Sequence, residues 1–419
     1  LIKEGKSFKP VSYEDALMVT AKKLQAIGAK YGKDSVAVAV SDRYTNEEAY
    51  VMKKLAETMG ARVMTFNRRE NGLKNIVGMD SSPNTIDELQ STDMILVTGF
   101  MATNTPVIYL KIREAAKKGV KVVLLNPKGF ENGFPFASDV VYTKNNLEPL
   151  KEIAKAILNE GKTSKDEGFN DFEKSLKDVK VSDKMGKIAK MYLESKKAMI
   201  VYQQNVLSVK GAELVGEIAA LSGHLGSPRD GILMVRPKNN SQGLVDMGIT
   251  EGEESLEGVK AMLIFGEDPK TPLKGLEFLA VSDTHMTKTM EKADVAFPAT
   301  GFASTEGTFT NTERRLQFVE KAIEEYVMPN FMLAQELALI FEDDYGFSEP
   351  EDISLEMDDT VESYRNAVVG EILGNVLKPS KISYKKAEEG KFADPLLNTD
   401  SLMDMIVARI PEPYNPKKD

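Results

Sequence analysis

Cysteine and tryptophan are absent from this chain, and only two of its 419 residues are histidine. Without cysteine the chain cannot form disulfides, ligate an iron–sulfur cluster or offer a thiolate nucleophile. With histidine only at positions 224 and 285, a His-Glu-x-x-His zinc motif is also missing. We favour structural roles for His224 and His285 over ligand contacts. From the residues alone we predict no catalytic residue and no metal ligand.

Long apolar runs and a basic excess are missing as well. No run approaches the roughly 18 residues that cross a bilayer, and residues 1–6 lack the apolar core of a signal peptide. The net charge of −10 argues against nucleic acid and anionic membranes as partners. A cytoplasmic location fits these features, as other compartments would. The chain does not begin with Met, so we expect a processed protein or a piece of a longer polypeptide.

Buried aliphatic runs alternate with helical periodicity along most of the chain, which is typical of α/β folds with parallel sheets. We expect helices after the capping residues Ser12, Thr45 and Thr105, with Thr105 capping a helix that starts at Pro106. Leu225 to Asn240 reads as a loop, and Glu306 to Arg315 as a loop that opens after the strand at Val295–Phe297. The expected strands are Ser35–Val40, Arg62–Thr65, Met94–Gly99, Val120–Leu125, Ala198–Tyr202, Ala261–Phe265, Phe278–Val281 and Val295–Phe297.

Polar, glycine-bearing loops follow these strands, where open α/β sheets bind their ligands. Such loops would suit a ligand with phosphates and a purine edge. The plainer alternative is that turns and helix caps need the same residues. The Gly-x-Gly-x-x-Gly, Walker A and Gly-x-Ser-x-Gly patterns do not occur, so an ordinary NAD, ATP or serine-hydrolase site is unsupported.

Six segments, in order, resemble the molybdopterin oxidoreductase family, which includes formate dehydrogenases, nitrate reductases and the large peripheral-arm subunit of respiratory complex I. The most similar is Ala293-Asp294-Val295 followed by Glu306–Arg315, with the sequence Glu-Gly-Thr-Phe-Thr-Asn-Thr-Glu-Arg-Arg. The others are Phe8–Leu17, Asp93–Gly99 with Leu125–Lys128, Gly223–Gly226, Asn239–Gly248 and Phe265–Pro269.

The resemblance covers about residues 1 to 345 and implies two Rossmann-like parallel-sheet domains. The first would comprise residues 1–68 and 246–345, the second residues 69–245, and residues 346–419 would form an irregular or helical extension. In the family, the matching loops grip the guanosine-bearing pterins of a molybdenum or tungsten cofactor, molybdopterin guanine dinucleotide. The cofactor contacts implied here are Gly99, Asn126, Asn240, Gly243, Gly266, Asp268, Asp283, Thr287, Gly307 and Thr308.

The chain also departs from the family pattern. Catalytic formate dehydrogenases carry a cysteine or selenocysteine metal ligand followed by histidine, but residues 67–85 contain neither, and Ser81 or Ser82 would have to substitute. The family's Asp-Pro-Arg reads Asn126-Pro127-Lys128, which loses a bidentate phosphate contact. The iron–sulfur segment expected before Leu1 and the cofactor-closing domain expected after Asp419 are missing. The segment Gly78–Thr98 is more similar to the complex I subunit.

Two functions follow from the resemblance. The first is a scaffold in an NADH-dehydrogenase-type electron-transfer complex, with no cofactor in this chain and with iron–sulfur and flavin-bearing partners. The alternative is a catalytic piece of a molybdenum or tungsten bis-pterin oxidoreductase such as a formate dehydrogenase. Neither reading implies a membrane span.

Overall fold

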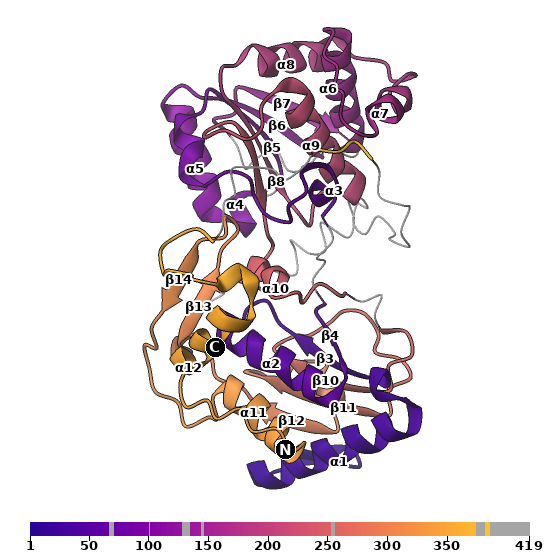
Figure 1. Cartoon of the computed structure of the whole chain (residues 1–419), viewed down its shortest axis with the longest axis vertical. Coiled ribbons are helices and arrows are strands. Elements are labelled where there is room, and N and C mark those ends of the chain that lie inside the picture. The colour runs from indigo at the N-terminus through magenta and orange to yellow at the C-terminus, as the bar shows by residue number, and fades with distance from the viewer. Residues whose placement is uncertain are drawn as a thin grey trace, which may run out of the picture. The chain divides into compact units, whose positions relative to one another are not determined.

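The computed structural model describes residues 1–66, 71–99, 101–127, 135–143, 146–252, 256–373 and 382–385. The chain divides into two compact units, residues 1–70 with 238–374 and residues 71–237 with 375–419. Each unit has its own parallel sheet flanked by helices (Figure 1). The expected α/β class with parallel-sheet domains is therefore confirmed. The expected separate extension over residues 346–419 stays a prediction.

Seven strands form the sheet of the first unit. In spatial order they are β2 (Ser7–Lys9), β1 (Ile2–Glu4), β12 (Val295–Pro298), β11 (Phe278–Asp283), β10 (Ala261–Phe265), β3 (Val36–Val40) and β4 (Arg62–Met64). The strands from β12 to β4 run parallel, while β1 is antiparallel to β12 and β2 to β1. Since β3 leads to β4 on one side and the chain returns as β10 on the other, the winding direction reverses between β3 and β10.

Helices cover one face of this sheet, and Val36, Val38 and Val40 point toward them. The helices are α1 (Tyr13–Tyr31), α2 (Asn46–Met59), α11 (Asn330–Ile340) and α12 (Pro350–Thr360). The alternate residues Ala37 and Ala39 face a second core, closed by loop side chains and the 3-10 helix η5 (Met290–Lys292). The unit also contains the short helix α10 (Ser241–Asp246) and the hairpin of β13 (Gly307–Thr310) and β14 (Leu316–Val319). The 3-10 helices η1 (Lys33–Ser35), η6 (Phe302–Ser304) and η7 (Glu362–Tyr364) complete it.

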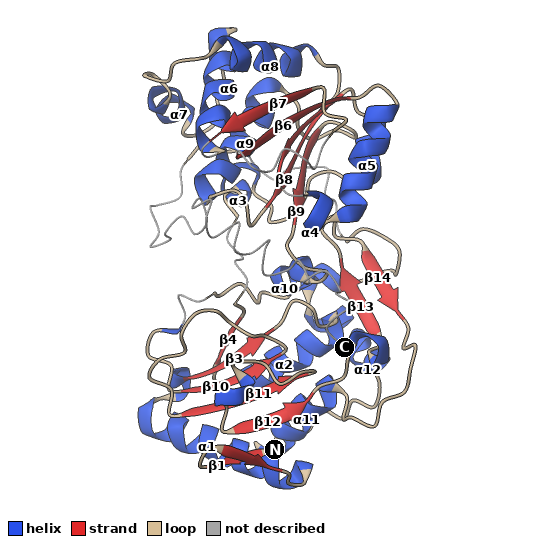
Figure 2. Ribbon diagram, turned by 180° about the vertical axis from the view of Figure 1, so that it is seen from behind, coloured by secondary structure: helices blue, strands red, loops and turns tan. Residues whose placement is uncertain are grey.

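Five parallel strands form the sheet of the second unit. Their spatial order is β7 (Asp139–Thr143), β6 (Lys121–Pro127), β5 (Met94–Thr98), β8 (Ala198–Gln203) and β9 (Gly231–Val235). One face packs against α3 (Leu73–Val77), α6 (Leu147–Asn159), α8 (Asp183–Glu194) and α9 (Val209–Ser222). The other packs against the 3-10 helix η2 (Asp87–Ser91) and α5 (Pro106–Lys117), with α4 (Met101–Asn104) next to α5 (Figure 2). Helix α7 (Phe169–Ser175) adds Phe172 to the first of these cores. The winding reverses between β5 and β8.

Local capping signals placed the starts of α1, α2 and α5. Thr45 accepts from the Glu48 amide and Glu48 accepts from the Thr45 amide, so the expected capping box is confirmed. Ser12 likewise accepts from the Asp15 amide at 3.0 Å. The expected start of α5 at Pro106, with Thr105 at the N-cap position, is confirmed, but the Thr105 hydroxyl makes no capping bond to the α5 amides. Helix α4 ends immediately before Thr105, and the Thr105 hydroxyl bonds back to the Met101 carbonyl at 3.5 Å instead.

Two stretches that the sequence indicated as loops are strands. Within Leu225 to Asn240 the structure contains β9, whose five residues are all buried. The surrounding glycines and prolines hid a strand that packs on both faces and so shows no alternation. The segment Glu306–Arg315, expected to be an open loop, contains β13, which pairs with β14 through a tight turn. Its Arg314 adopts a positive φ of 62° in that turn.

Candidate functional site

In the second unit, the sheet brings together two residues that the sequence singled out, Gly99 and Asn126. They follow the neighbouring strands β5 and β6 and bond to each other twice. The Gly99 amide donates to Asn126 Oδ1 at 3.0 Å, and Asn126 Nδ2 donates to the Gly99 carbonyl at 3.1 Å. Gly99 has φ of 135°, and a Cβ there would lie 2.8 Å from Gln203 Oε1 at the end of β8. This cluster therefore lies at the switch point between β5 and β8.

A buried ion pair that sequence reasoning missed lies at the carboxyl ends of β8 and β9. The Arg236 side chain is 0% exposed and donates from Nη2 to Asp80 Oδ1 at 2.7 Å. It also donates to the Asp80 carbonyl at 2.8 Å and to Gln204 Oε1 at 3.1 Å. A single arginine in a proline- and glycine-rich stretch gives no periodic signal, and its partner lies 156 residues away in the sequence.

The serine hydroxyl that would have to replace a cysteine metal ligand has a structural role. Ser82 is fully buried; its Oγ donates to the Met234 carbonyl at 2.8 Å and accepts from the Met234 amide at 2.9 Å. Asn84 continues this edge contact, because the Ile232 amide donates to Asn84 Oδ1 at 3.0 Å. Ser81 is also buried, with 3% of its surface exposed. A metal at Ser82 would break the bonds that fix this segment beside β9.

In the first unit, polar groups gather at the switch point between β3 and β10. Ser41 Oγ donates to Glu267 Oε1 at 2.8 Å, and the Gly266 amide donates to the Ser282 carbonyl at 2.8 Å. Burial raises the pKa of the Glu267 carboxyl, and the charge of Asp42 raises it further, while Arg43 and Lys238 oppose both effects. Gly266 has φ of 69°, and a Cβ there would lie 2.8 Å from the Tyr44 ring.

Asp268 and Thr287 shape the turn into η5. Asp268 Oδ1 accepts from the Thr289 amide at 3.0 Å and from its hydroxyl at 2.6 Å, and Thr287 Oγ1 accepts from the Met290 amide at 3.1 Å. Asp283 Oδ1 accepts from the Thr284 amide at 2.7 Å, and Asp283 lines a cavity of about 410 Å³. Among the described residues, these hydrogen bonds do not join Asp268, Asp283 or Thr287 to Gly307 or Asn240. The sheet places these residues along one edge without linking them.

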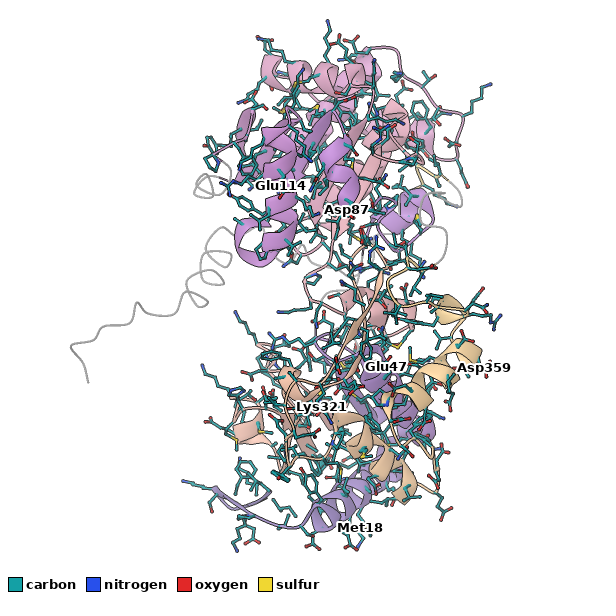
Figure 3. The ribbon with its side chains drawn as sticks, turned by 90° about the vertical axis from the view of Figure 1, so that its left-hand side faces the viewer. Met18, Glu47, Asp87, Glu114, Lys321 and Asp359 are labelled. Atoms are coloured by element: carbon teal, nitrogen blue, oxygen red, sulfur yellow. The ribbon has the colours of Figure 1, made fainter. Side chains whose placement is uncertain are left out.

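The first turn of α2 collects the other four predicted residues of this unit. Thr308 donates to the Glu47 carboxylate from its amide at 2.7 Å and from its hydroxyl at 2.6 Å. Asn46 Nδ2 donates to the hydroxyls of Thr308 and Thr310 at 3.0 and 3.1 Å, and Asn240 Oδ1 accepts from the Thr310 amide at 2.9 Å. We call Asn46, Glu47, Asn240, Thr308 and Thr310 the α2 clasp; the position of Glu47 is labelled in Figure 3.

Two glycines allow the α2 clasp to close. A Cβ on Gly243 would lie 2.2 Å from the side-chain oxygens of both Asn240 and Asn46. A Cβ on Gly307 would lie 2.5 Å from Glu47 Oε2, and the φ of Gly307 is 140°. Both glycines are therefore required by close approach within the chain itself.

The arginines of the same sequence signature also pair inside the unit. Arg314 Nε donates to Asp246 Oδ2 at 3.0 Å, and Arg315 Nε donates to Glu313 Oε1 at 2.7 Å. His224, in the second unit, is buried with Nδ1 2.6 Å from Asp230 Oδ1 and Nε2 2.9 Å from the Tyr192 carbonyl. The polar groups of these motifs thus serve the fold.

Two adjacent buried carboxyl groups lie at the start of α2. Burial raises the pKa of Glu48 to about 7, although bonds from the Thr45 amide and Asn330 oppose the shift. Burial also raises the pKa of Glu47, partly offset by the bonds from Thr308 and Ser354. The protonated form of Glu48 is therefore favoured in the fold, relative to an unfolded chain in which the carboxyl has its ordinary pKa.

This difference predicts that stability falls as the pH rises. The contribution of Glu48 to the free energy of unfolding is fully present below its ordinary pKa of 4.5. It is lost as the pH rises through about 7, the pKa in the fold. Between pH 5 and pH 8 the free energy of unfolding should fall by on the order of 2 kcal/mol from this group. Urea unfolding of the wild-type chain and of Glu48→Gln across this range measures the difference in slope.

The Glu48→Gln variant should show the shallower pH dependence, since an amide does not titrate. Glu57 lies on the same helix with 60% of its side chain exposed, so Glu57→Gln is the matched control and should keep the wild-type slope. Parallel slopes for wild type and Glu48→Gln would contradict the assignment.

Neither a metal-binding cluster nor a membrane-spanning helix occurs among the residues that the structure describes. Among them, no group of three or more His, Asp or Glu side chains is placed to hold a metal ion. Within the described ranges, no helix combines the length and the apolar character needed to span a bilayer.

Comparison with known proteins decides the family. Residues 1–328 match the family model described as molybdopterin oxidoreductase. The chain belongs to the molybdopterin oxidoreductase family. It is 29% identical over 400 residues to formate dehydrogenase H of Escherichia coli, covering 76% of this chain and 56% of that protein. It is 27% identical over 426 residues to F420-dependent formate dehydrogenase 2 subunit alpha of Methanococcus maripaludis, covering 81% of this chain and 61% of that subunit.

Solved structures share the fold of this family member. Acetylene hydratase from Pelobacter acetylenicus superposes with a TM-score of 0.68 at 15% identity, covering 90% of this chain and 67% of that chain. A chain of the formyltransferase/hydrolase complex from Methylorubrum extorquens superposes with a TM-score of 0.58 at 15% identity, covering 82% of this chain and 98% of that chain. This chain therefore spans little more than half the length of the formate dehydrogenases above, yet nearly all of that second chain.

Proposed function

We propose that this chain is a molybdopterin-oxidoreductase-type scaffold subunit or domain of an NADH-dehydrogenase-type electron-transfer complex, without a redox centre of its own. Electrons would pass through iron–sulfur and flavin groups on partner subunits. The absence of cysteine from all 419 residues supports this proposal, because no cluster can be ligated by thiolates of this chain.

The observation that carries the proposal is where the amides of the family's cofactor loops donate. The Gly99 amide donates to Asn126 and the Gly266 amide to the Ser282 carbonyl. The Thr308 amide donates to Glu47, and the Thr310 amide to Asn240. A pyrophosphate bound on these loops would need such amides as donors. Each of the four already has an acceptor within the fold.

The carboxylate of Glu47 adds an electrostatic argument. It lies directly beneath Gly307 and Thr308, where a bound phosphate would meet a second acceptor rather than a donor. Ser82 is equally committed, to Met234. These amide donors and Ser82 already have partners within the fold, which argues against a metal-bearing bis-pterin dinucleotide on these loops. The ten predicted cofactor contacts remain a prediction. Several of these residues also have a structural role, because they bond or pack within the fold.

The alternative is a catalytic piece of a molybdenum or tungsten bis-pterin enzyme of the formate dehydrogenase type. It is favoured by the similarity to proteins named formate dehydrogenases and by a cationic side chain, Arg236, at the carboxyl ends of the strands. Under this alternative the missing ligand and cluster would come from other segments or subunits.

Elemental analysis separates the two functions. The chain is purified from cells that make the bis-pterin cofactor, beside an active formate dehydrogenase as positive control. Molybdenum, tungsten and the fluorescence of oxidised pterin are then measured per chain. We expect all three to be far below stoichiometric in this chain and stoichiometric in the control. One molybdenum or tungsten per chain would overturn the scaffold proposal and support the alternative.

A further inference from the structure

Two neighbouring segments of the first unit each expose large apolar side chains. Phe302 is 92% exposed, Tyr326 108% and Ile323 54%. Single exposed apolar residues are ordinary on a protein surface. Here the three come from η6 and from residues 320–326, which the backbone holds together. We call Phe302, Ile323 and Tyr326 the aromatic patch.

Hydrogen bonds fix the aromatic patch in place. The amides of Ala322 and Ile323 both donate to the Ala303 carbonyl, at 2.8 and 3.0 Å. The Gly301 amide donates to Glu325 Oε2 at 3.3 Å. Because the two segments are joined at Gly301 and at Ala303, the backbone that carries the patch is held in one arrangement. A preformed surface loses less conformational entropy when a partner binds.

Acidic side chains surround the aromatic patch. Residues 320–326 read Glu-Lys-Ala-Ile-Glu-Glu-Tyr, with three carboxylates and one cation, all exposed. The cation, Lys321, which is labelled in Figure 3, is paired with Glu324 at 2.9 Å. The hydrogen bond with Glu324 raises the pKa of Lys321, and the charge of Glu306 adds to that effect. The rim of the patch is therefore negative on balance.

We propose that the aromatic patch is a docking surface for a partner polypeptide that offers an apolar socket flanked by arginine or lysine side chains. Exposed aromatic residues are enriched as anchors at protein interfaces. Complementary charge at the rim would steer and orient the partner. Nucleic acid and anionic lipid meet the same carboxylates and are repelled. A second copy of this chain would oppose one acidic rim with another across a two-fold axis. The proposal holds under either function of the chain.

A matched pair of labelled peptides tests this surface on the full chain. One is an amphipathic helix with leucine on one face and arginine on the other, and its partner carries glutamate in place of arginine. We expect the arginine peptide to bind the wild-type chain, more weakly as salt is raised, and the glutamate peptide not to bind. The double variant Phe302→Ser, Tyr326→Ser should weaken binding by at least about tenfold. Glu320→Lys with Glu324→Lys should reverse the peptide preference.

The control is Leu355→Ser, because Leu355 is 70% exposed on α12 and lies outside the patch. Its affinity for the arginine peptide should equal that of wild type, and circular dichroism should show every variant folded. Equal binding of both peptides, no binding, or equal losses in the Leu355 variant would overturn the proposal. If the wild-type chain self-associates in sedimentation and the Phe302→Ser, Tyr326→Ser variant does not, the occupant of the patch is a second copy of this chain, and the proposed partner is wrong. If the wild-type chain binds anionic vesicles and the same variant does not, the occupant is a membrane, and the proposed partner is again wrong. Metal content, which tests the scaffold function, affects none of these results.

Discussion

Replacing Gly307 with alanine is expected to destabilise the folded chain by about 3 kcal/mol. Two effects combine at this position. The φ of 140° is one that L side chains rarely adopt, and the new methyl would lie 2.5 Å from the buried Glu47 Oε2 and 3.1 Å from Thr45 Oγ1. Relieving the overlap requires opening the bonds from Thr308 to Glu47. Urea unfolding monitored by circular dichroism measures the loss directly, without a ligand or an activity assay.

A second glycine provides the reference. Gly248 also has a positive φ, 81°, but a Cβ there would meet nothing within 4 Å. Gly248→Ala should therefore carry only the cost of a left-handed backbone, about 1 kcal/mol. The larger loss in Gly307→Ala reports the close approach in the α2 clasp together with the less accessible φ of 140°. Equal losses would show that Glu47 moves aside freely and that the clasp is not tightly packed.

Removing the carboxylate of Asp80 is expected to cost about 3 kcal/mol or more. The Asp80→Ala variant leaves the guanidinium of Arg236, which is 0% exposed, without its 2.7 Å partner. The bonds from Arg236 to the residue-80 carbonyl and to Gln204 do not neutralise its charge. Thermal and urea unfolding would detect the loss, and Arg236 should become reactive toward guanidinium-modifying reagents.

An exposed ion pair of the same unit provides the control. Lys111 and Asp87 lie 2.8 Å apart, but 32% and 78% of their side chains are exposed. Asp87→Ala should cost less than about 1 kcal/mol because solvent screens that pair. Adding Arg236→Met to Asp80→Ala should recover part of the stability, since the buried guanidinium is then removed together with the carboxylate that it pairs with. A double variant less stable than Asp80→Ala alone would contradict the role assigned to the pair.

Local chemistry made much of the fold predictable. Strand Ala261–Phe265 was placed to the residue, because a fully buried run bounded by polar turns has few alternatives. The capping box at Thr45 and Glu48 and the left-handed Gly60 placed both ends of α2. These features depend on neighbours within four residues, which a single sequence displays.

Contacts between distant residues could not be predicted in the same way. The bond from Thr308 to Glu47 spans 261 residues, and the sequence around either residue gives no signal of this contact. Resemblance to the family indicated that Thr308 mattered, but assigned it to a ligand rather than to a buried carboxylate. Strand β9 was missed because Gly231 and Pro237 resemble loop residues. Burial on both faces, which marks β9 as a strand, shows only in three dimensions.

The α2 clasp has a consequence for the order in which the chain can fold during synthesis. Glu47 and Glu48 leave the ribosome early, but their partners Thr308 and Asn330 emerge much later, after residues 71–237 of the second unit. The inserted unit, residues 71–237, has its complete sheet available before the first unit can close. Vectorial synthesis thus favours folding of the inserted unit first, while the nascent α2 keeps its carboxylates hydrated and ionised until the last third of the chain arrives.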